Sequence, residues 1–167
     1  MPILDPHTLD FLSHSAGQTQ RYGVRLGELL EPGDLVCLNG GLGAGKTCLS
    51  NGIGRGFGIA EPLTSPTFTL MNEYRRPGDG QTIVHADCYR LTGTREALDA
   101  GLGEYLDGSY VVLVEWPERV AEMLPAERLW ITLRVIGDTK RSLLMEGRGA
   151  RYMKLLTDFR LSAFGIK

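Results

Sequence analysis

Lysine is scarce in this chain of 167 residues, and neither sign of charge predominates. The only lysines are Lys46, Lys140, Lys154 and Lys167. The formal net charge is −2, so the sequence lacks the basic excess that is typical of nucleic-acid-binding domains. We therefore expect no DNA partner, and the charge gives no sign of direct RNA contact.

Cysteine and long apolar runs are scarce too. The cysteines Cys37, Cys48 and Cys88 are odd in number, far apart and without a C-x-x-C motif, which argues against a zinc site or a disulfide framework. Three isolated thiols are typical of a reducing cytoplasm. No apolar stretch approaches the length of a membrane span, and the N-terminus lacks the basic-then-apolar run of a signal peptide. We expect a cytoplasmic location and no membrane partner.

The order of apolar periodicities predicts a single α/β domain over residues 1–167. Strands are expected at 9–14, 35–39, 67–74, 82–87, 110–114, 129–135 and 142–146. Helices are expected at 15–30, 46–56, 94–100, 103–106, 119–124 and 150–159, with Ser15 opening a capping box and Thr94 as a cap. Alternating strands and helices favour a largely parallel sheet, and the hairpins indicate antiparallel strands at its edges.

Residues 40–47 match the phosphate-binding pattern G-x-x-x-x-G-K-[ST] (Walker A) at every fixed position. Small residues let successive backbone N–H groups face one anion, and the helix that follows turns its positive dipole end toward the same place. Lys46 can reach the β- and γ-phosphates, and Thr47 offers a hydroxyl to Mg²⁺. A chance glycine-rich turn is the alternative, and the apolar strand in front of the loop makes it the weaker one.

The helix after this loop carries two stripes. Leu49, Ile53 and Phe57 recur at four-residue spacing and predict a core-facing side. Gly52 and Gly56, with a cysteine one turn earlier, form a second stripe of small residues. We interpret this second stripe as close packing of the helix on the sheet.

Two acids, Asp87 and Glu115, each follow an apolar strand. Ligands of open α/β sheets bind at the carboxyl ends of the strands, so both acids fit the carboxylate of a Mg²⁺ site. Each can instead cap a neighbouring helix or pair with an arginine. Thr67, between the loop and the first acid, is either a switch-loop residue that senses the γ-phosphate or a turn residue that enters a strand.

Three neighbours of these acids also have two interpretations. His85 shares a strand face with Asp87 and can act as a general base, although a buried, hydrogen-bonded histidine is the favoured interpretation. Trp116 belongs to the core or covers the site. Arg90 contacts phosphate or pairs with an acid.

Four motifs in this order resemble the bacterial TsaE family. They are G-G-L-G-A-G-K-T at 40–47, S-P-T-F at 65–68, H-A-D-C-Y-R at 85–90 and V-E-W-P-E at 114–118. The resemblance runs from about residue 33 to 125. TsaE is the small ATPase of tRNA threonylcarbamoyladenosine (t6A) biosynthesis. The resemblance implies a P-loop NTPase fold, a three-layer α/β/α sandwich with a central parallel sheet and antiparallel edge strands.

The resemblance also implies ATP and Mg²⁺ as cofactors. The residues implied to bind the nucleotide are Gly41, Leu42, Gly43, Ala44, Gly45, Lys46, Thr47 and Cys48. The implied metal ligands are Thr47, Asp87 and Glu115, and the implied catalytic residues are Glu115, Lys46 and Thr67. The residues alone do not decide which acid holds the metal and which aligns water. The resemblance places Asp87 on the metal.

In this family the ATPase is weak alone and is thought to reset a TsaB–TsaD complex that modifies position 37 of tRNA. The resemblance therefore implies TsaB and TsaD as partners, with tRNA reached only through the complex. Two residues depart from the family pattern: Gly41 replaces a usual acid, and Cys48 replaces a usual second threonine. Neither change removes a required ligand. Cys48 is expected to lie in or beside the site as a thiol that nucleotide protects.

Three other functions compete with this interpretation. A small-molecule P-loop kinase fits the size and the loop, but an arginine-rich lid and an acceptor-site acid pair are not evident. A GTPase needs N-K-x-D and D-x-x-G, and neither tetrapeptide occurs. An interaction module with a vestigial pocket is disfavoured because Lys46, Thr47, Asp87 and Glu115 are all retained.

Overall fold

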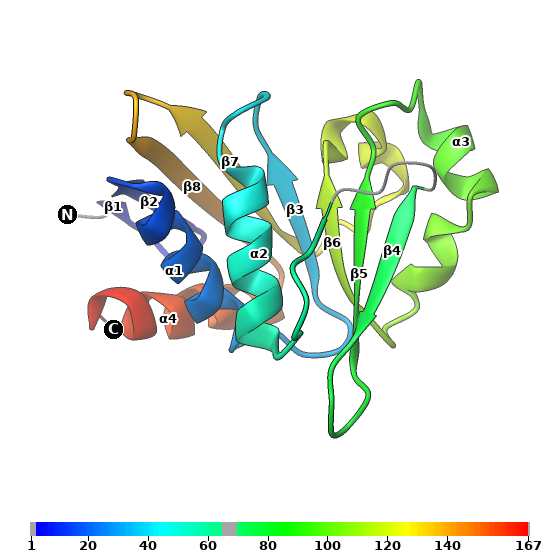
Figure 1. The fold of residues 1–167 in the computed structure, drawn as a ribbon, viewed down its shortest axis with the longest axis horizontal. Coiled ribbons are helices and arrows are strands. Elements are labelled where there is room, and N and C mark those ends of the chain that lie inside the picture. The colour runs from blue at the N-terminus through cyan, green and yellow to red at the C-terminus, as the bar shows by residue number, and fades with distance from the viewer. Residues whose placement is uncertain (1–2, 65–69, 167) are drawn as a thin grey trace.

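The structure, a computed structural model, describes residues 3–64 and 70–166. One sheet in this part of the chain has the strand order β1-β2-β8-β7-β3-β6-β5-β4 (Figure 1). The strands are β1 Ile3–Leu4, β2 Thr8–Ser13, β3 Leu35–Asn39, β4 Met71–Arg75, β5 Thr82–Asp87, β6 Val111–Glu115, β7 Arg128–Val135 and β8 Arg141–Arg148. The helices are α1 Ala16–Gly27, α2 Lys46–Phe57, α3 Thr94–Asp99 and α4 Ala150–Phe164, and the 3₁₀ turns are η1 Leu102–Leu106, η2 Pro117–Arg119 and η3 Ala121–Met123.

The centre of the sheet is parallel and its edges are antiparallel. β3 pairs in parallel with β6 and β7, and β6 pairs in parallel with β5. β4 flanks this centre on one side, and the β8–β2–β1 ribbon flanks it on the other, both antiparallel. The predicted α/β fold class is confirmed, and the carboxyl ends of β3, β5 and β6 meet at one edge of the sheet.

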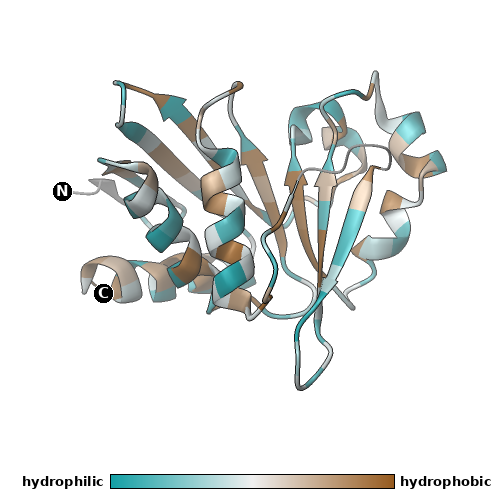
Figure 2. Ribbon diagram, viewed as in Figure 1, coloured by the Kyte–Doolittle hydropathy of each residue, from teal (hydrophilic) through white to brown (hydrophobic). Residues whose placement is uncertain are grey.

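The central strands are buried on both faces, so each strand contributes side chains to two apolar clusters. Val36 and Leu38 of β3 pack on the side of α1, α2 and α4, whereas Leu35 and Cys37 pack on the side of α3 and the 3₁₀ turns. Figure 2 shows these strands as the most hydrophobic part of the ribbon. The predicted three layers are therefore present.

The small-residue stripe of α2 packs against helix α1, not on the sheet as the sequence interpretation had it. A Cβ added to Gly52 would lie 2.1 Å from the Gln20 carbonyl oxygen, and one added to Gly56 would lie 2.1 Å from the Val24 carbonyl oxygen. A Cβ added to Gly23 of α1 would lie 2.5 Å from the Leu49 carbonyl oxygen of α2. Only residues without a Cβ allow the two helices to approach this closely.

Some element boundaries differ from the expectations. Ser15 does cap α1 and accepts a hydrogen bond from the Gln18 backbone N–H at 3.0 Å. Thr94 was wrongly expected as a cap, because it is the first residue of α3 and Gly93 occupies the cap position. The helix expected at 119–124 is two separate 3₁₀ turns that lie on either side of Val120. The short strand β1 was not expected, and residues 67–69 of the strand expected at 67–74 lie outside the described part.

The terminal helix α4 extends to Phe164, five residues beyond its expected end at 159. Its extra turn places Phe164 against Phe11 of β2 at a ring-centroid distance of 5.2 Å. Tyr22 of α1 completes this aromatic cluster at 4.8 Å from Phe11. Tertiary packing of rings therefore prolongs a helix that local pattern ends earlier. No helix in the described residues is long and apolar enough to cross a membrane.

Candidate nucleotide-binding site

The predicted phosphate loop connects the carboxyl end of β3 to the first turn of α2. Gly43 and Gly45 have φ values of +77° and +108°, in the left-handed region that glycine adopts without strain. Gly40 passes within 2.9 Å, measured from an added Cβ, of the Leu133 carbonyl oxygen of β7. These glycines shape a concave loop, and the unsatisfied N–H groups of the first turn of α2 open onto it.

Lys46 lies at the centre of this loop and is 7% exposed. Its Nζ donates hydrogen bonds to the carbonyl oxygens of Gly40 and Gly41. Burial lowers the pKa of the Lys46 ammonium, and the nearby carboxylates of Glu115, Asp87 and Glu118 oppose this effect. The loop thus holds a poorly solvated cation that a phosphate group would stabilise.

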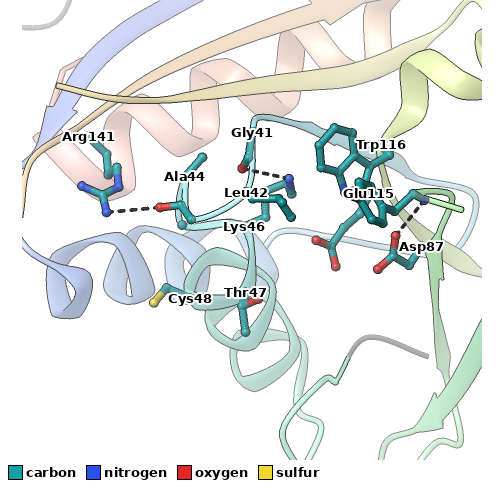
Figure 3. Close-up of a pocket in the computed structure, with 13 residues that line it drawn as sticks. Gly41, Leu42, Ala44, Lys46, Thr47, Cys48, Asp87, Glu115, Trp116 and Arg141 are labelled. Carbon is teal, nitrogen blue, oxygen red and sulfur yellow. Dashed lines mark hydrogen bonds between the residues drawn. The ribbon is translucent and has the colours of Figure 1, made fainter. Parts of the chain in front are cut away.

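Asp87 and Glu115 reach the same cavity as the loop, as the sequence predicted. They are direct neighbours in the parallel register of β5 and β6. The cavity has a volume of about 370 Å³ and is lined by residues 41–48 together with both acids. In Figure 3 the two carboxylates lie on one side of the loop, with Lys46 between them and the rest of the loop.

The two acids differ in their surroundings. Asp87 is partly exposed, and its Oδ1 accepts a hydrogen bond from the Tyr89 backbone N–H at 3.0 Å. Glu115 is 3% exposed, and its Oε2 lies 2.5 Å from Nε2 of His85. His85 is therefore the buried, hydrogen-bonded histidine that the sequence interpretation favoured. Its partner is the second acid, which was not expected.

Trp116 belongs to both the core and the site. Its backbone has φ of +58°, the only positive value among the described non-glycine residues. This conformation turns its ring over Lys46, with Nζ 4.0 Å from the ring centroid. The Trp116 ring also contacts the Tyr89 ring at a centroid distance of 4.9 Å. A strained backbone at the rim of a cavity is typical of functional sites.

Arg141, at the start of β8, is a lining residue that the sequence interpretation missed. Its guanidinium donates to the Gly43 carbonyl oxygen at 3.2 Å and to the Lys140 carbonyl oxygen at 2.9 Å. In Figure 3 Arg141 lies on the side of the loop away from Asp87. Nothing in the local sequence marks this residue, because its partner is 98 positions earlier in the chain.

The remaining predicted residues are placed as follows. Thr47 and Cys48 line the cavity from the first turn of α2. Thr67 lies outside the described residues, and Arg90 is exposed and does not line the described cavity. No group of three or more His, Cys, Asp or Glu side chains in the described ranges forms a metal cage. Mg²⁺ in nucleotide sites needs only one or two protein ligands beside phosphate and water, so Thr47 with Asp87 or Glu115 fits that ion.

Comparison with known proteins agrees with this geometry. The family model described as "Threonylcarbamoyl adenosine biosynthesis protein TsaE" matches residues 13–143. The chain belongs to the TsaE family. The TsaE protein of Treponema pallidum is 44% identical over 132 residues, which cover 79% of this chain and 96% of the relative. The TsaE protein of Streptomyces coelicolor is 43% identical over 135 residues, which cover 78% and 90%.

A solved structure with a similar sequence also shares the fold of this chain. The crystal structure of Bacillus subtilis YdiB matches with a TM-score of 0.74 and 32% identity, over 95% of each chain. The match therefore extends well beyond the four sequence motifs. The resemblance to TsaE that the motifs indicated is confirmed.

Proposed function

We propose that this chain is a Mg²⁺-dependent ATPase of t6A biosynthesis that acts on a TsaB–TsaD complex. The observation that carries the proposal is one cavity in which the glycine loop and Lys46 face the carboxylates of Asp87 and Glu115. Membership of the TsaE family supports the pathway, because the family model and the curated relatives are named for it. tRNA would be reached through the complex and not by this chain.

The described residues have distinct roles in this proposal. The loop backbone and the first turn of α2 bind the phosphates through N–H groups. Lys46 exchanges the carbonyl oxygens of Gly40 and Gly41 for phosphate oxygens, which accept more strongly because they are charged. Thr47 and Asp87 would hold Mg²⁺, whose charge neutralises the phosphate oxygens. Glu115 orients the water that attacks the γ-phosphate.

Two features of the loop separate this chain from the usual family pattern. An added Cβ at Gly41 meets no described atom within 4 Å, so the fold does not require glycine there. Cys48 lines the cavity where a threonine is usual. Both changes leave the phosphate and metal ligands in place, so we expect nucleotide binding to be retained.

The proposal is tested by ATP turnover of the purified chain, alone and with TsaB and TsaD from the same source. We expect slow release of inorganic phosphate that the pair accelerates and that Glu115→Gln lowers by about 100-fold. Glu118→Gln is the matched control, because Glu118 is an exposed acid near the same cavity. Its turnover should stay close to that of the wild type.

Two results would contradict the proposal. Turnover that is indifferent to the TsaB–TsaD pair would remove the partner from the mechanism. Phosphate that appears in an added small molecule and not as free phosphate would favour the alternative, a small-molecule P-loop kinase.

A further inference from the structure

His85 is a buried polar residue to which the proposed function assigns no part in binding phosphate or Mg²⁺ or in orienting water. It lies on β5 two residues before Asp87, so both side chains point to the α2 face of the sheet. The side chain is 1% exposed, and its direct neighbour across the parallel register is the apolar Leu113. An aliphatic side chain is therefore accommodated in the adjacent position of the same layer.

Only one of the two ring nitrogens of His85 has a hydrogen-bond partner among the described residues. Nε2 lies 2.5 Å from Oε2 of Glu115, whereas Nδ1 has no hydrogen-bond partner among the described residues. A buried nitrogen without a partner is unfavourable, and an apolar side chain would avoid that cost. The contact with Glu115 is thus the reason the structure offers for a histidine at this position.

This contact fixes the carboxylate that faces the cavity. Glu115 is the last residue of β6, and its side chain has three rotatable bonds that the strand does not restrain. As a donor, Nε2 of His85 holds Oε2 of Glu115 and leaves the other carboxylate oxygen to face the cavity that Lys46 and Asp87 share. Groups that orient a catalytic carboxylate in this way belong to the supporting shell of an active site.

We propose that His85 is a positioning residue for ATP hydrolysis, which donates Nε2–H to Glu115 and fixes the orientation of that carboxylate. This inference rests on the proposed function, because it assigns His85 a role in the same reaction. It predicts that His85 acts on the chemical step and not on nucleotide binding, since the loop, Lys46 and Thr47 are untouched.

Two variants separate positioning from packing. His85→Leu fills the position with an apolar side chain of similar size but removes the donor. His85→Gln keeps an N–H donor that can reach Glu115. We expect His85→Leu to lower kcat about 10-fold or more with KM for MgATP unchanged within about twofold, and His85→Gln to recover most of the loss.

The ring N–H itself gives a second readout by proton NMR. The wild type should show a downfield imidazole N–H resonance that exchanges slowly because the ring is buried. Glu115→Gln should move this resonance upfield, since the acceptor loses its charge, and His85→Leu should remove it. The other histidines, His7 and His14, are exposed and should not give a protected signal.

The possible outcomes are distinct. If the turnover of His85→Leu stays within about twofold of the wild-type value, the role of His85 is overturned but the proposed function is not. A parallel loss of kcat, MgATP affinity and thermal stability in both variants shows a packing role and also overturns it. A resonance unaffected by Glu115→Gln removes the pairing on which the role depends. A wild type that hydrolyses no ATP, with or without TsaB–TsaD, overturns the proposed function together with this inference.

Discussion

At the residue scale, the position of Lys46 favours phosphate binding and lowers the stability of the nucleotide-free protein. Its ammonium is almost buried, and burial lowers its pKa. We expect Lys46→Met to abolish the rise in Tm that MgATP produces without lowering the Tm of the nucleotide-free chain. The reason is that the variant removes both the phosphate ligand and a poorly solvated charge. Thermal unfolding with and without MgATP measures both effects.

The stability difference between Lys46→Met and the wild type should depend on pH, with a definite sign. The folded-state pKa of Lys46 lies below its unfolded-state value of about 10.4, so the folded chain carries an extra cost while the lysine is charged. This cost is full below the folded-state pKa and is relieved as the pH rises toward the unfolded-state value. The stability of Lys46→Met relative to wild type should therefore fall over that window. A nucleotide-free variant that melts well below wild type at pH 7 would show that the carbonyl contacts of Lys46 dominate instead.

The three thiols should react very differently. Burial raises the pKa of both Cys37 and Cys88 to about 12, so neither forms thiolate near neutral pH. Cys48 is partly exposed and lines the cavity. We expect iodoacetamide to label Cys48 first, and MgATP at ten times its Kd to slow this labelling about 10-fold.

Peptide mapping by mass spectrometry assigns the labelled thiol, and Cys48→Ser is the control that should remove the signal. Labelling of Cys48 at a rate that MgATP does not change would place the thiol outside the nucleotide site.

Sequence reasoning found the residues of this site that lie in local motifs. Lys46 and Thr47 follow from the loop pattern, and Asp87 and Glu115 follow from their positions after apolar strands. Arg141 was not predictable in this way, because its contact with the loop depends on the pairing of β7 with β8. The identity of the Glu115 partner depends in the same way on the register between two strands.

At the element scale, the contact between α1 and α2 depends on glycine. A Cβ at Gly23 would lie 2.5 Å from the Leu49 carbonyl oxygen, an atom that cannot move without disturbing α2. We expect Gly23→Ala to lower the free energy of unfolding by about 2–3 kcal/mol through overpacking. Chemical denaturation with urea measures the change.

Gly17 provides the control in the same helix. Its added Cβ would meet the flexible end of Arg21 at 3.4 Å and Ser15 Oγ at 3.9 Å, and no backbone atom, so Gly17→Ala should stabilise the chain by about 0.5–1 kcal/mol through helix propensity. Equal effects of the two substitutions would mean that the helices separate easily. Sequence reasoning identified the small-residue stripe but not its partner, because close approach to a helix and close approach to a sheet require the same residues.

The β7–β8 hairpin is joined to the phosphate loop by Arg141. This residue holds the Gly43 carbonyl oxygen and therefore restrains a loop whose residues 41–43 are exposed. We expect Arg141→Ala to weaken MgATP binding about 5-fold, about 1 kcal/mol, with little change in Tm. Calorimetric titration measures the affinity, and Arg134→Ala, an exposed arginine of β7, is the control. An unchanged affinity in Arg141→Ala would show that the loop keeps its shape without the hairpin.

At the scale of the whole molecule, the C-terminal helix anchors the strand that carries the phosphate loop. Arg151, in the first turn of α4, donates to Oδ1 and Oδ2 of Asp34 at 2.8 and 2.6 Å. The next residue, Tyr152, accepts a hydrogen bond through its hydroxyl from the Leu35 backbone N–H at 2.8 Å. Both contacts fix the start of β3, whereas the phosphate loop lies at its opposite end. No local pattern predicts this link, since 117 residues separate the partners.

Asp34 is 2% exposed, so its charge depends on Arg151 for compensation. We expect Asp34→Asn to lower the free energy of unfolding by about 2–3 kcal/mol, because it removes the nearer charged partner of Arg151 and leaves Glu31, at 3.5 Å. Asp158→Asn is the control, since Asp158 pairs with Lys154 on the exposed side of α4 and such pairs contribute less than about 0.5 kcal/mol. MgATP affinity, corrected for the unfolded fraction, should stay the same in both variants because β6 and β7 hold β3 on either side. A loss of affinity in Asp34→Asn alone would mean that the start of β3 is coupled to the phosphate loop, and that α4 can influence nucleotide binding from the far end of the sheet.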